Sequence, residues 1–200
     1  MEEPGYESIG SMMINSGAID ITDPGYDADT WCRINNLKVK PGKYDCYIYP
    51  INLSSWGERV AVMRIAHEKA KPFDTTHFKG TVGVDAGLMS ISEAGTKPDY
   101  DYNQWLAVLK DFEQFEKTHP HQLAHVMPLP STDPNAKKQF WSPSGIGDGE
   151  YGVYIVDTHD PQNEEAIPDM IEVVFFDEDD LWALDSIESE EYQKQEKERE

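Results

Sequence analysis

A β-strand pattern that occurs twice is the feature that most constrains the fold of this chain. Ser16 to Asp23 alternates apolar and polar residues, which is the period of a β-strand with one buried face. Ala86 to Glu93 repeats the same order of residue types: a small residue, Gly, two apolar positions, Ile, a hydroxyl residue and an acid.

Two further stretches match in the same order. The pattern G-x-Y-x-x-Y-I occurs at Gly42–Ile48 and again at Gly149–Ile155, and Met170–Phe176 stands where Arg59–Ile65 stood. Each match alone is weak, because Tyr, Gly and Ile are common in strands. Three matches in one order indicate a duplicated antiparallel unit, and the alternative is two unrelated antiparallel sheets with similar turns.

The tyrosines of the second match are expected to lie on both sides of their sheet. Tyr44 and Tyr47 are three residues apart, as are Tyr151 and Tyr154. Residues at this spacing in a strand face opposite sides. We therefore expect one tyrosine of each pair in the core and the other half-exposed.

The second unit contains an insertion with the one long helical pattern of the chain, Tyr102 to Lys117. Asp99 or Asp101 can cap its start, and Pro120 ends it. Apolar residues at spacings of three and four give it one apolar stripe. The stripe consists of Trp105, Leu106, Leu109, Phe112 and Phe115 or Glu116.

These patterns predict an α+β fold that is mostly β. Two related antiparallel units pack into one body, with one inserted amphipathic helix and an acidic C-terminal helix or tail. We expect a single β-rich domain over residues 1–187. Unit 1 covers about 14–68, and unit 2 covers about 80–178 with the helical insertion at 101–118. Residues 188–200 are expected to be an acidic tail.

Other stretches lack a regular pattern. Residues 1–12 are expected to form a loose arm, and residues 121–143 a loop punctuated by prolines. After the second unit, Asp179 or Asp180 can cap a short helix. Its apolar residues, Leu181, Trp182, Leu184 and Ile187, are expected to dock on the core.

The net charge of the chain limits the classes of partner that it can bind. The formal net charge is −21, from 38 acidic and 17 basic residues. Direct binding to nucleic acid or to an anionic membrane requires Lys and Arg on one face, so neither is expected. The two cysteines, Cys32 and Cys46, and an N-terminus without an apolar run indicate reduced thiols and a cytoplasmic protein.

A glycine-rich stretch is the first candidate site. Residues 144–151 read S-G-I-G-D-G-E-Y, and successive glycines let backbone N–H groups converge on an anion. The stretch leads into a strand and lacks Lys, so it is not a phosphate loop of the Walker type. A tight turn is the alternative. The candidate ligand-binding residues are Ser144, Gly145, Gly147, Asp148, Tyr151 and Asp85.

Three other groups of residues are candidate sites. His119, His121 and His125 resemble a zinc-ligand spacing, but Pro120 argues against a shared helical face, so no metal site and no cofactor are predicted. Asp23 and Asp85 flank the repeated elements at non-equivalent positions, which disfavours a symmetric carboxylate pair. An acidic run is the candidate partner-binding segment. It consists of Asp177, Glu178, Asp179 and Asp180.

Three stretches together resemble a known group of sequences. They are V-D-A-G at Val84–Gly87, S-G-I-G-D-G-E-Y at residues 144–151, and I-T-D-P-G-Y at Ile21–Tyr26. The sequence resembles bacterial and phage proteins that include the domain-of-unknown-function 4241 family, over roughly residues 16–177. Ala86 departs from the pattern, in which Ser is commoner. The resemblance implies a mostly β fold and a bacterial or phage cytoplasmic setting, and it supplies no catalytic residues.

The sequence favours a non-enzymatic binding protein. The acidic charge, the absence of a coherent catalytic set and the resemblance to phage proteins indicate an inhibitor, immunity or anti-defence protein acting on a basic partner surface. One alternative is a small-ligand-binding protein or hydrolase-type enzyme with a pocket near residues 144–151. The other is a phage virion or assembly component.

Overall fold

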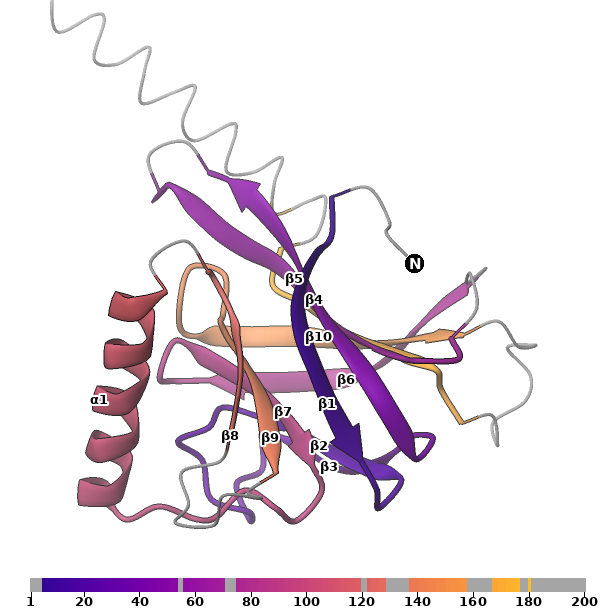
Figure 1. The fold of residues 1–200 in the computed structure, drawn as a ribbon, viewed down its shortest axis with the longest axis horizontal. Coiled ribbons are helices and arrows are strands. Elements are labelled where there is room, and N and C mark those ends of the chain that lie inside the picture. Colours follow the sequence, from indigo (N-terminus) through magenta and orange to yellow (C-terminus); the bar gives the residue numbers. More distant parts are fainter. Residues whose placement is uncertain are drawn as a thin grey trace, which may run out of the picture.

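The computed structural model is mostly β, with 53% strand and 13% helix among the residues that it describes, which confirms the predicted fold class. The described part of the chain forms two antiparallel sheets and one helix (Figure 1). The structure describes residues 5–53, 56–70, 75–119, 122–128, 137–157, 167–176 and 180.

Sheet A has six strands in the order β1-β4-β5-β11-β10-β6, and every neighbouring pair is antiparallel. Strands distant in the sequence are therefore neighbours in its centre. The strands are β1 (Glu7–Ile14), β4 (Gly42–Asn52), β5 (Glu58–His67), β6 (Thr75–Val84), β10 (Gly149–Asp157) and β11 (Met170–Val174).

Sheet B has five strands in the order β3-β2-β7-β9-β8, also antiparallel throughout. The inserted helix α1 (Tyr102–Thr118) and β8 lie between β7 and β9 in the sequence. The strands are β2 (Ala18–Thr22), β3 (Ile34–Lys38), β7 (Leu88–Glu93), β8 (His125–Pro128) and β9 (Lys138–Pro143).

The core lies between the two sheets, and α1 covers the other side of sheet B (Figure 1). Val108 and Phe112 of α1 pack on Leu88, Met127 and Trp141. The molecule thus has α1, sheet B and sheet A in succession. Within the described residues, no helix lies over the outer face of sheet A. A sheet face that carries apolar side chains normally packs against another element. The outer face of sheet A is therefore a candidate binding surface.

The two predicted β-units pair through equivalent strands. β2 pairs with β7, and Ile21 faces its sequence counterpart Ile91. β5 pairs with β11 in the middle of sheet A. The ladders of β1 and β6 both shift register just before a glycine, Gly10 in β1 and Gly80 in β6. Equivalent strands with equivalent bulges give sheets A and B an approximate twofold arrangement.

The turns that precede β2 and β7 are also equivalent. Gly17 and Gly87 have φ of 72° and 65°, a left-handed conformation that glycine adopts without steric cost. The carbonyl of Gly17 accepts from the amide of Val39 at 3.0 Å, and the carbonyl of Gly87 accepts from the amide of Ser144 at 3.1 Å. The shared Gly of the repeated pattern is therefore a requirement of the turn.

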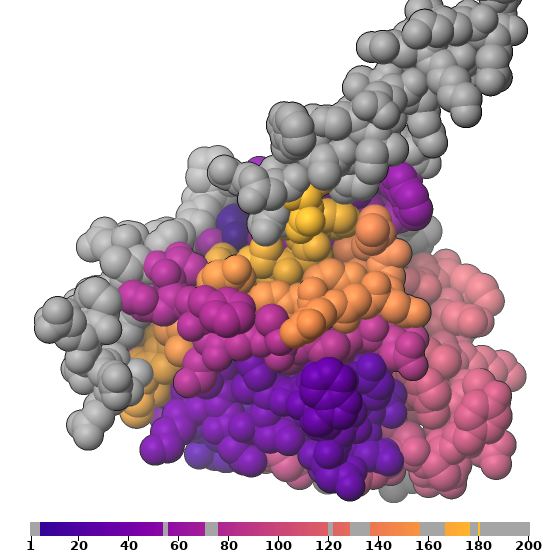
Figure 2. Space-filling model, turned by 180° about the vertical axis from the view of Figure 1, so that it is seen from behind, coloured from indigo at the N-terminus to yellow at the C-terminus, as the bar shows by residue number. Residues whose placement is uncertain are grey.

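The segment between β2 and β3 lies beside β6, at the edge of sheet A. Seen from behind, this segment (indigo to purple) lies beneath β6 (magenta) (Figure 2). The amide of Gly83 in β6 donates to the carbonyl of Cys32 at 2.8 Å. Cys32 and the buried Cys46 are both free thiols. No helix in the described part of the chain is long and apolar enough to cross a membrane.

Several sequence-based predictions of elements were wrong. Residues 7–12 are not a loose arm, because they form most of β1. Residues 121–143 contain β8 and β9, whose pairing with each other and with β7 overrides their proline-rich composition. In the stripe of α1, Leu106 is 45% exposed, and Val108 is buried in its place. The N-cap of α1 is Asp101, which forms a capping box with Gln104.

Candidate functional site

A row of side chains crosses the outer face of sheet A, with one residue from each of five neighbouring strands. Pairing across the strands places Tyr47 beside Arg64, Arg64 beside Glu172, Glu172 beside Tyr154, and Tyr154 beside Phe78. Tyr44 and Tyr151 are buried on the opposite face, as the spacing of the tyrosines predicts. The row is defined by these five residues: Tyr47, Arg64, Glu172, Tyr154 and Phe78.

A buried ion pair stands in the centre of the row. The Arg64 Nη2 and Nε atoms lie 2.5 Å and 2.6 Å from the Glu172 Oε1 atom. The Tyr6 ring lies over the guanidinium, with 3.6 Å from Cζ to the ring centroid, and its hydroxyl donates to Glu172 at 2.9 Å. A charge removed from water must be paired and hydrogen-bonded, and these contacts meet that requirement. The charges at the centre of the face, between the two β-units, are therefore satisfied, and removing one partner would leave the other buried and unpaired.

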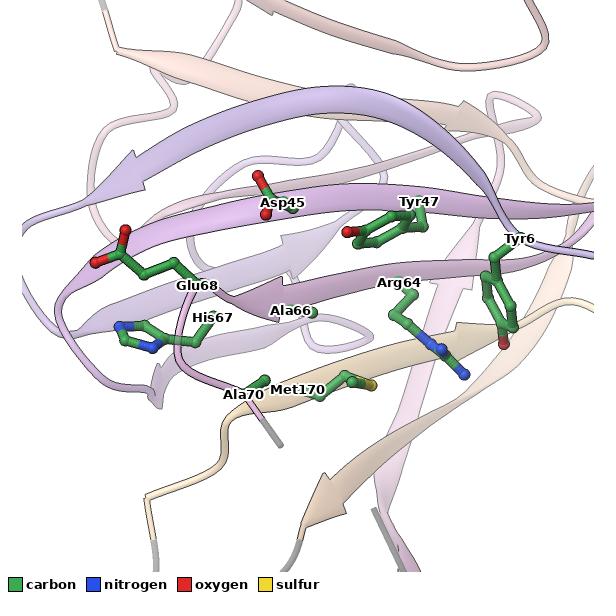
Figure 3. A pocket seen from close by; sticks show the side chains of 9 residues that line it. All are labelled: Tyr6, Asp45, Tyr47, Arg64, Ala66, His67, Glu68, Ala70 and Met170. Atoms are coloured by element: carbon green, nitrogen blue, oxygen red, sulfur yellow. The ribbon is translucent and has the colours of Figure 1, made fainter. Parts of the chain in front are cut away.

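Tyr6 separates two depressions on this face. Figure 3 shows the smaller one, of about 110 Å³, where Tyr6 and Arg64 lie at one end and His67 and Glu68 at the other. The His67 ring is already occupied, since its Nδ1 accepts from the amide of Lys69 and its Nε2 lies 3.2 Å from the carbonyl of Pro41. Its volume and its occupied histidine make this depression a weak candidate for ligand binding.

The larger depression, which we call the sheet groove, has a volume of about 700 Å³. Its lining is largely apolar, and Glu172 is its single charged residue among those described. It crosses strands from both β-units. Its principal lining residues are Tyr6, Tyr49, Val62, Tyr154, Val174 and Phe176. An apolar depression of this size, on a sheet face that no described helix covers, fits a binding surface.

The glycine-rich turn is mainly structural. The Ser144 hydroxyl donates to the carbonyl of Gly147 at 2.7 Å, and the Tyr151 hydroxyl lies 2.9 Å and 2.7 Å from the carbonyls of Ser144 and Gly147. Burial raises the pKa of Tyr151. A Cβ on Gly145 would lie only 3.0 Å from the Phe176 ring, so glycine permits this close packing. Ser144, Gly147 and Tyr151 therefore use their polar groups to hold the turn.

A second groove runs beside this turn, and we call it the turn groove. Its volume is about 410 Å³. Asp148, Glu150 and Asp180 line it together with apolar residues. Asp148 also accepts from the amide of Gly87 at 3.1 Å, and Glu150 accepts from the Thr81 hydroxyl. The structure thus brings two candidates from separate predictions, Asp148 and Asp180, to one groove.

Asp85 is not part of that groove. Its side chain is exposed, and its amide donates to the buried carboxylate of Asp23 at 2.8 Å. The same carboxylate accepts from the amide of Ala86 at 2.7 Å. Burial is the largest influence on the pKa of Asp23 and raises it, while the backbone N–H groups lower it. The role of Asp23 is to hold the turn before β7.

The other β-unit contains the counterpart of this contact. Glu93, which matches Asp23 in the repeated pattern, accepts from the amides of Asn15 and Ser16 at 3.0 Å and 2.5 Å. Lys137 lies 2.6 Å from the second oxygen of Glu93. Each unit therefore binds the turn of the other through one carboxylate. The equivalence is between Asp23 and Glu93, so Asp23 and Asp85 are not a carboxylate pair.

Of the candidate zinc-ligand histidines, His119 and His125 lie at α1, on the side of sheet B that faces away from sheet A. His125 is buried against Phe112 and Phe115, and His119 stacks on Phe115 with ring centroids 4.1 Å apart. The centroids of His119 and His125 are 6.4 Å apart. His121 lies outside the described residues, as do Asp177, Glu178 and Asp179 of the acidic run.

No protein-family model, no curated protein and no solved structure matches this chain. The resemblance to the domain-of-unknown-function 4241 family therefore stays a prediction. The candidate site rests on geometry: the row of five residues, the sheet groove and the turn groove. The sequence indicated the turn groove through its glycines and Asp148. It did not indicate the sheet groove, whose lining residues come from strands far apart in the chain.

Proposed function

We propose that this protein is a non-enzymatic binding protein that captures a protein partner with a basic surface. The observation that carries the proposal is the outer face of sheet A, which holds the sheet groove and has no described helix over it. Protein-binding surfaces combine aromatic and apolar side chains at their centre with a polar rim. Tyr49 and Phe78, 37% and 62% exposed, give this face exposed aromatic rings.

The electrostatics favour a basic partner. The whole chain carries a net charge of −21, so its field attracts cations at long range and repels anions. Such attraction mainly raises the rate of association and excludes wrong partners. Contact on an apolar groove then slows dissociation, because buried apolar area leaves water.

The biological setting belongs to the same proposal. An inhibitor, immunity or anti-defence protein of bacterial or phage origin, acting in the cytoplasm, would use such a surface to occupy a basic groove on its target. The support for this setting is the resemblance of residues 21–26, 84–87 and 144–151 and the acidic charge.

Affinity capture with a salt series tests the proposal. The purified chain is immobilised and exposed to lysate of its source cell at 0.1 M NaCl, and bound proteins are identified by mass spectrometry. The expected result is a basic protein whose purified form binds at least about tenfold more weakly at 0.5 M NaCl, because the Debye length then falls below about 5 Å. Capture of an acidic protein, or binding that salt leaves unchanged, would refute the proposal.

A small-ligand site in the turn groove is the second candidate. Its volume of about 410 Å³ lies in the usual range for ligand pockets. Its described lining offers carboxylates and aromatic rings and lacks Cys, His, Ser and Lys, which favours binding of a cationic ligand over hydrolysis. Thermal stabilisation of the chain by small amines, without capture of any protein, would select this function instead.

A further inference from the structure

We infer that the sheet groove and the turn groove form one docking surface for an amphipathic protein segment that carries Lys or Arg beside large apolar side chains. The inference rests on the proposed function and specifies where the partner binds and what its contacting segment contains. The sheet groove is apolar and accounts for the large apolar side chains of the segment. The turn groove is acidic and accounts for its Lys or Arg.

The two grooves are continuous. Tyr154, Val174 and Phe176 line both of them. Tyr154 and Val174 project from the neighbouring strands β10 and β11 toward the outer face. The Phe78 ring meets Tyr154 edge-on, with centroids 5.6 Å apart, and extends the aromatic surface to the sheet edge. A bound segment can therefore place apolar side chains along the sheet groove while one end reaches the turn groove.

The apolar part of the surface calls for large apolar side chains. Tyr49 faces Val62 across β4 and β5, and Val62 faces Val174 across β5 and β11. These three side chains make a second row beside the row of five. Such a surface gains free energy when apolar area of a partner displaces its water, at roughly 25 cal/mol per Å² buried. A segment without large apolar side chains would leave this gain unused.

The carboxylates of the turn groove indicate that the bound segment also carries basic side chains. Asp148, Glu150 and Asp180 line the turn groove, and no Lys or Arg is among its described lining residues. Glu172, the charged residue of the sheet groove, is already paired with Arg64, so the attraction comes from the three carboxylates of the turn groove. A Lys or Arg on the segment gains from these carboxylates and from the ring faces of Tyr154 and Phe176. A nucleic acid or anionic lipid would set phosphates against the same carboxylates.

A second copy of this chain is disfavoured as the occupant. Two copies would bring together surfaces of equal negative charge, each on a chain of net charge −21. The complementary partner therefore has to be a different protein, with the opposite charge at the contact.

The probe for the test is a fluorescein-labelled synthetic peptide designed as an amphipathic helix. Leu and Phe, at spacings of three and four, form one face, and Lys and Arg form the other. Two matched peptides serve as controls: one has Glu in place of every basic residue, and the other has Ser in place of every apolar residue. Fluorescence anisotropy against the full chain at 0.1 M NaCl is expected to show binding of the basic amphipathic peptide. Both control peptides are expected to bind at least about tenfold more weakly.

Substitutions locate the contact. Val62→Asp and Tyr154→Ala, in the sheet groove, are each expected to weaken binding of the basic peptide by about tenfold. Asp148→Asn with Glu150→Gln, which keep the hydrogen-bonding shape of both side chains, should weaken binding by about threefold to tenfold. Leu106→Asp and the pair Asp111→Asn with Glu113→Gln make matched changes on α1 and should leave affinity unchanged. Thermal melts of each variant confirm folding.

The outcomes separate this inference from the proposed function. If the basic peptide binds but the groove variants bind as tightly as the parent chain, the docking surface is wrong and the proposed function stands. If the basic peptide does not bind, the docking surface is wrong, and the salt series of the affinity capture decides the proposed function separately. A photo-crosslinker replacing Val62 identifies the occupant directly. A crosslink to the peptide supports the inference, whereas a crosslink to another copy or within the same chain overturns it.

Discussion

Asp23 shows how one buried side chain can hold two distant turns. Its carboxylate accepts from the amides of Gly25, Asp85 and Ala86 at 2.7, 2.8 and 2.7 Å. Asp23→Ala would leave these partly buried N–H groups without their acceptor, at about 1 kcal/mol for each. We therefore expect the free energy of unfolding, measured by urea denaturation at pH 7, to fall by about 3 kcal/mol.

Asp85 provides the matched control for that substitution. Asp85 also has a carboxylate at the repeated turn, but this side chain is exposed. Only the backbone amide of Asp85 takes part in the contact with Asp23. Asp85→Ala should change the free energy of unfolding by less than about 0.5 kcal/mol. Equal effects of the two substitutions would contradict the assignment of the turn to Asp23.

His125 makes the fold sensitive to acid. Burial, with a smaller effect of His119, lowers the pKa of His125 from 6.5 to about 4. The unfolded chain takes up this proton below pH 6.5 and the folded chain only near pH 4, so stability falls as the pH drops through that window. Between pH 7 and pH 4.5 the loss from this residue is about 2 kcal/mol.

The pH dependence can be assigned by comparing two substitutions. His125→Leu removes the titrating group and suits the apolar site between Phe112 and Phe115. Urea denaturation of this variant at pH 7, 5.5 and 4.5 should show a loss of stability smaller than that of the parent by about 2 kcal/mol. His119→Gln, at an exposed site, should keep the acid sensitivity of the parent. An unchanged pH profile in the His125 variant would refute the assignment.

At the scale of the element, the apolar residues of helix α1 are expected to contribute unequally to the stability of the fold. Phe112 is 4% exposed and packs on Trp141, with ring centroids 5.5 Å apart. Phe112→Ala should lower the free energy of unfolding by about 3–4 kcal/mol. Leu106, with 45% of its surface exposed, is the control, and Leu106→Ala should cost less than about 1 kcal/mol. Chemical denaturation of both variants makes the comparison.

The elements that the sequence predicted are those with a strong period of their own. The repeated pattern of β2 and β7 alternates clearly, and α1 has a stripe and a capping box. β6 has Gly80 and Gly83 in its interior, which weaken any strand signal. β8 and β9 end at Pro128 and Pro143, so their pattern resembles a loop. Pairing with neighbouring strands determines these elements, and pairing is not visible in a local pattern.

The same reason limits prediction of the site. The glycine-rich turn is contiguous in the sequence, so its Asp148 could be selected as a candidate. Val62 and Val174 lie in different β-units and become neighbours only when β5 pairs with β11. Among the described residues, the lack of a helix over the outer face of sheet A is a property of the layer order, because α1 packs on sheet B. Neither property has a signal in a single stretch of residues.

At the scale of the whole molecule, the net charge of −21 should make salt act on folding and on binding in opposite directions. Repulsion among the excess carboxylates opposes the compact state. Raising NaCl from 0.05 M to 0.5 M screens that repulsion and should raise the Tm by about 2–4 °C, which corresponds to about 1 kcal/mol. Differential scanning fluorimetry in NaCl measures this shift without the surface exclusion that sulfate would add.

The direction of that shift decides how weaker peptide binding at high salt is to be interpreted. If the Tm rises while peptide affinity falls over the same NaCl series, the lost affinity cannot come from unfolding of sheet A. It then reports screening between the basic segment and carboxylates such as Asp148 and Glu150. A Tm that falls with salt would instead show that ion pairs, such as Lys137–Glu93 at 2.6 Å and Arg64–Glu172 at 2.5 Å, outweigh the repulsion. Salt-sensitive binding would then require a folding control at every concentration.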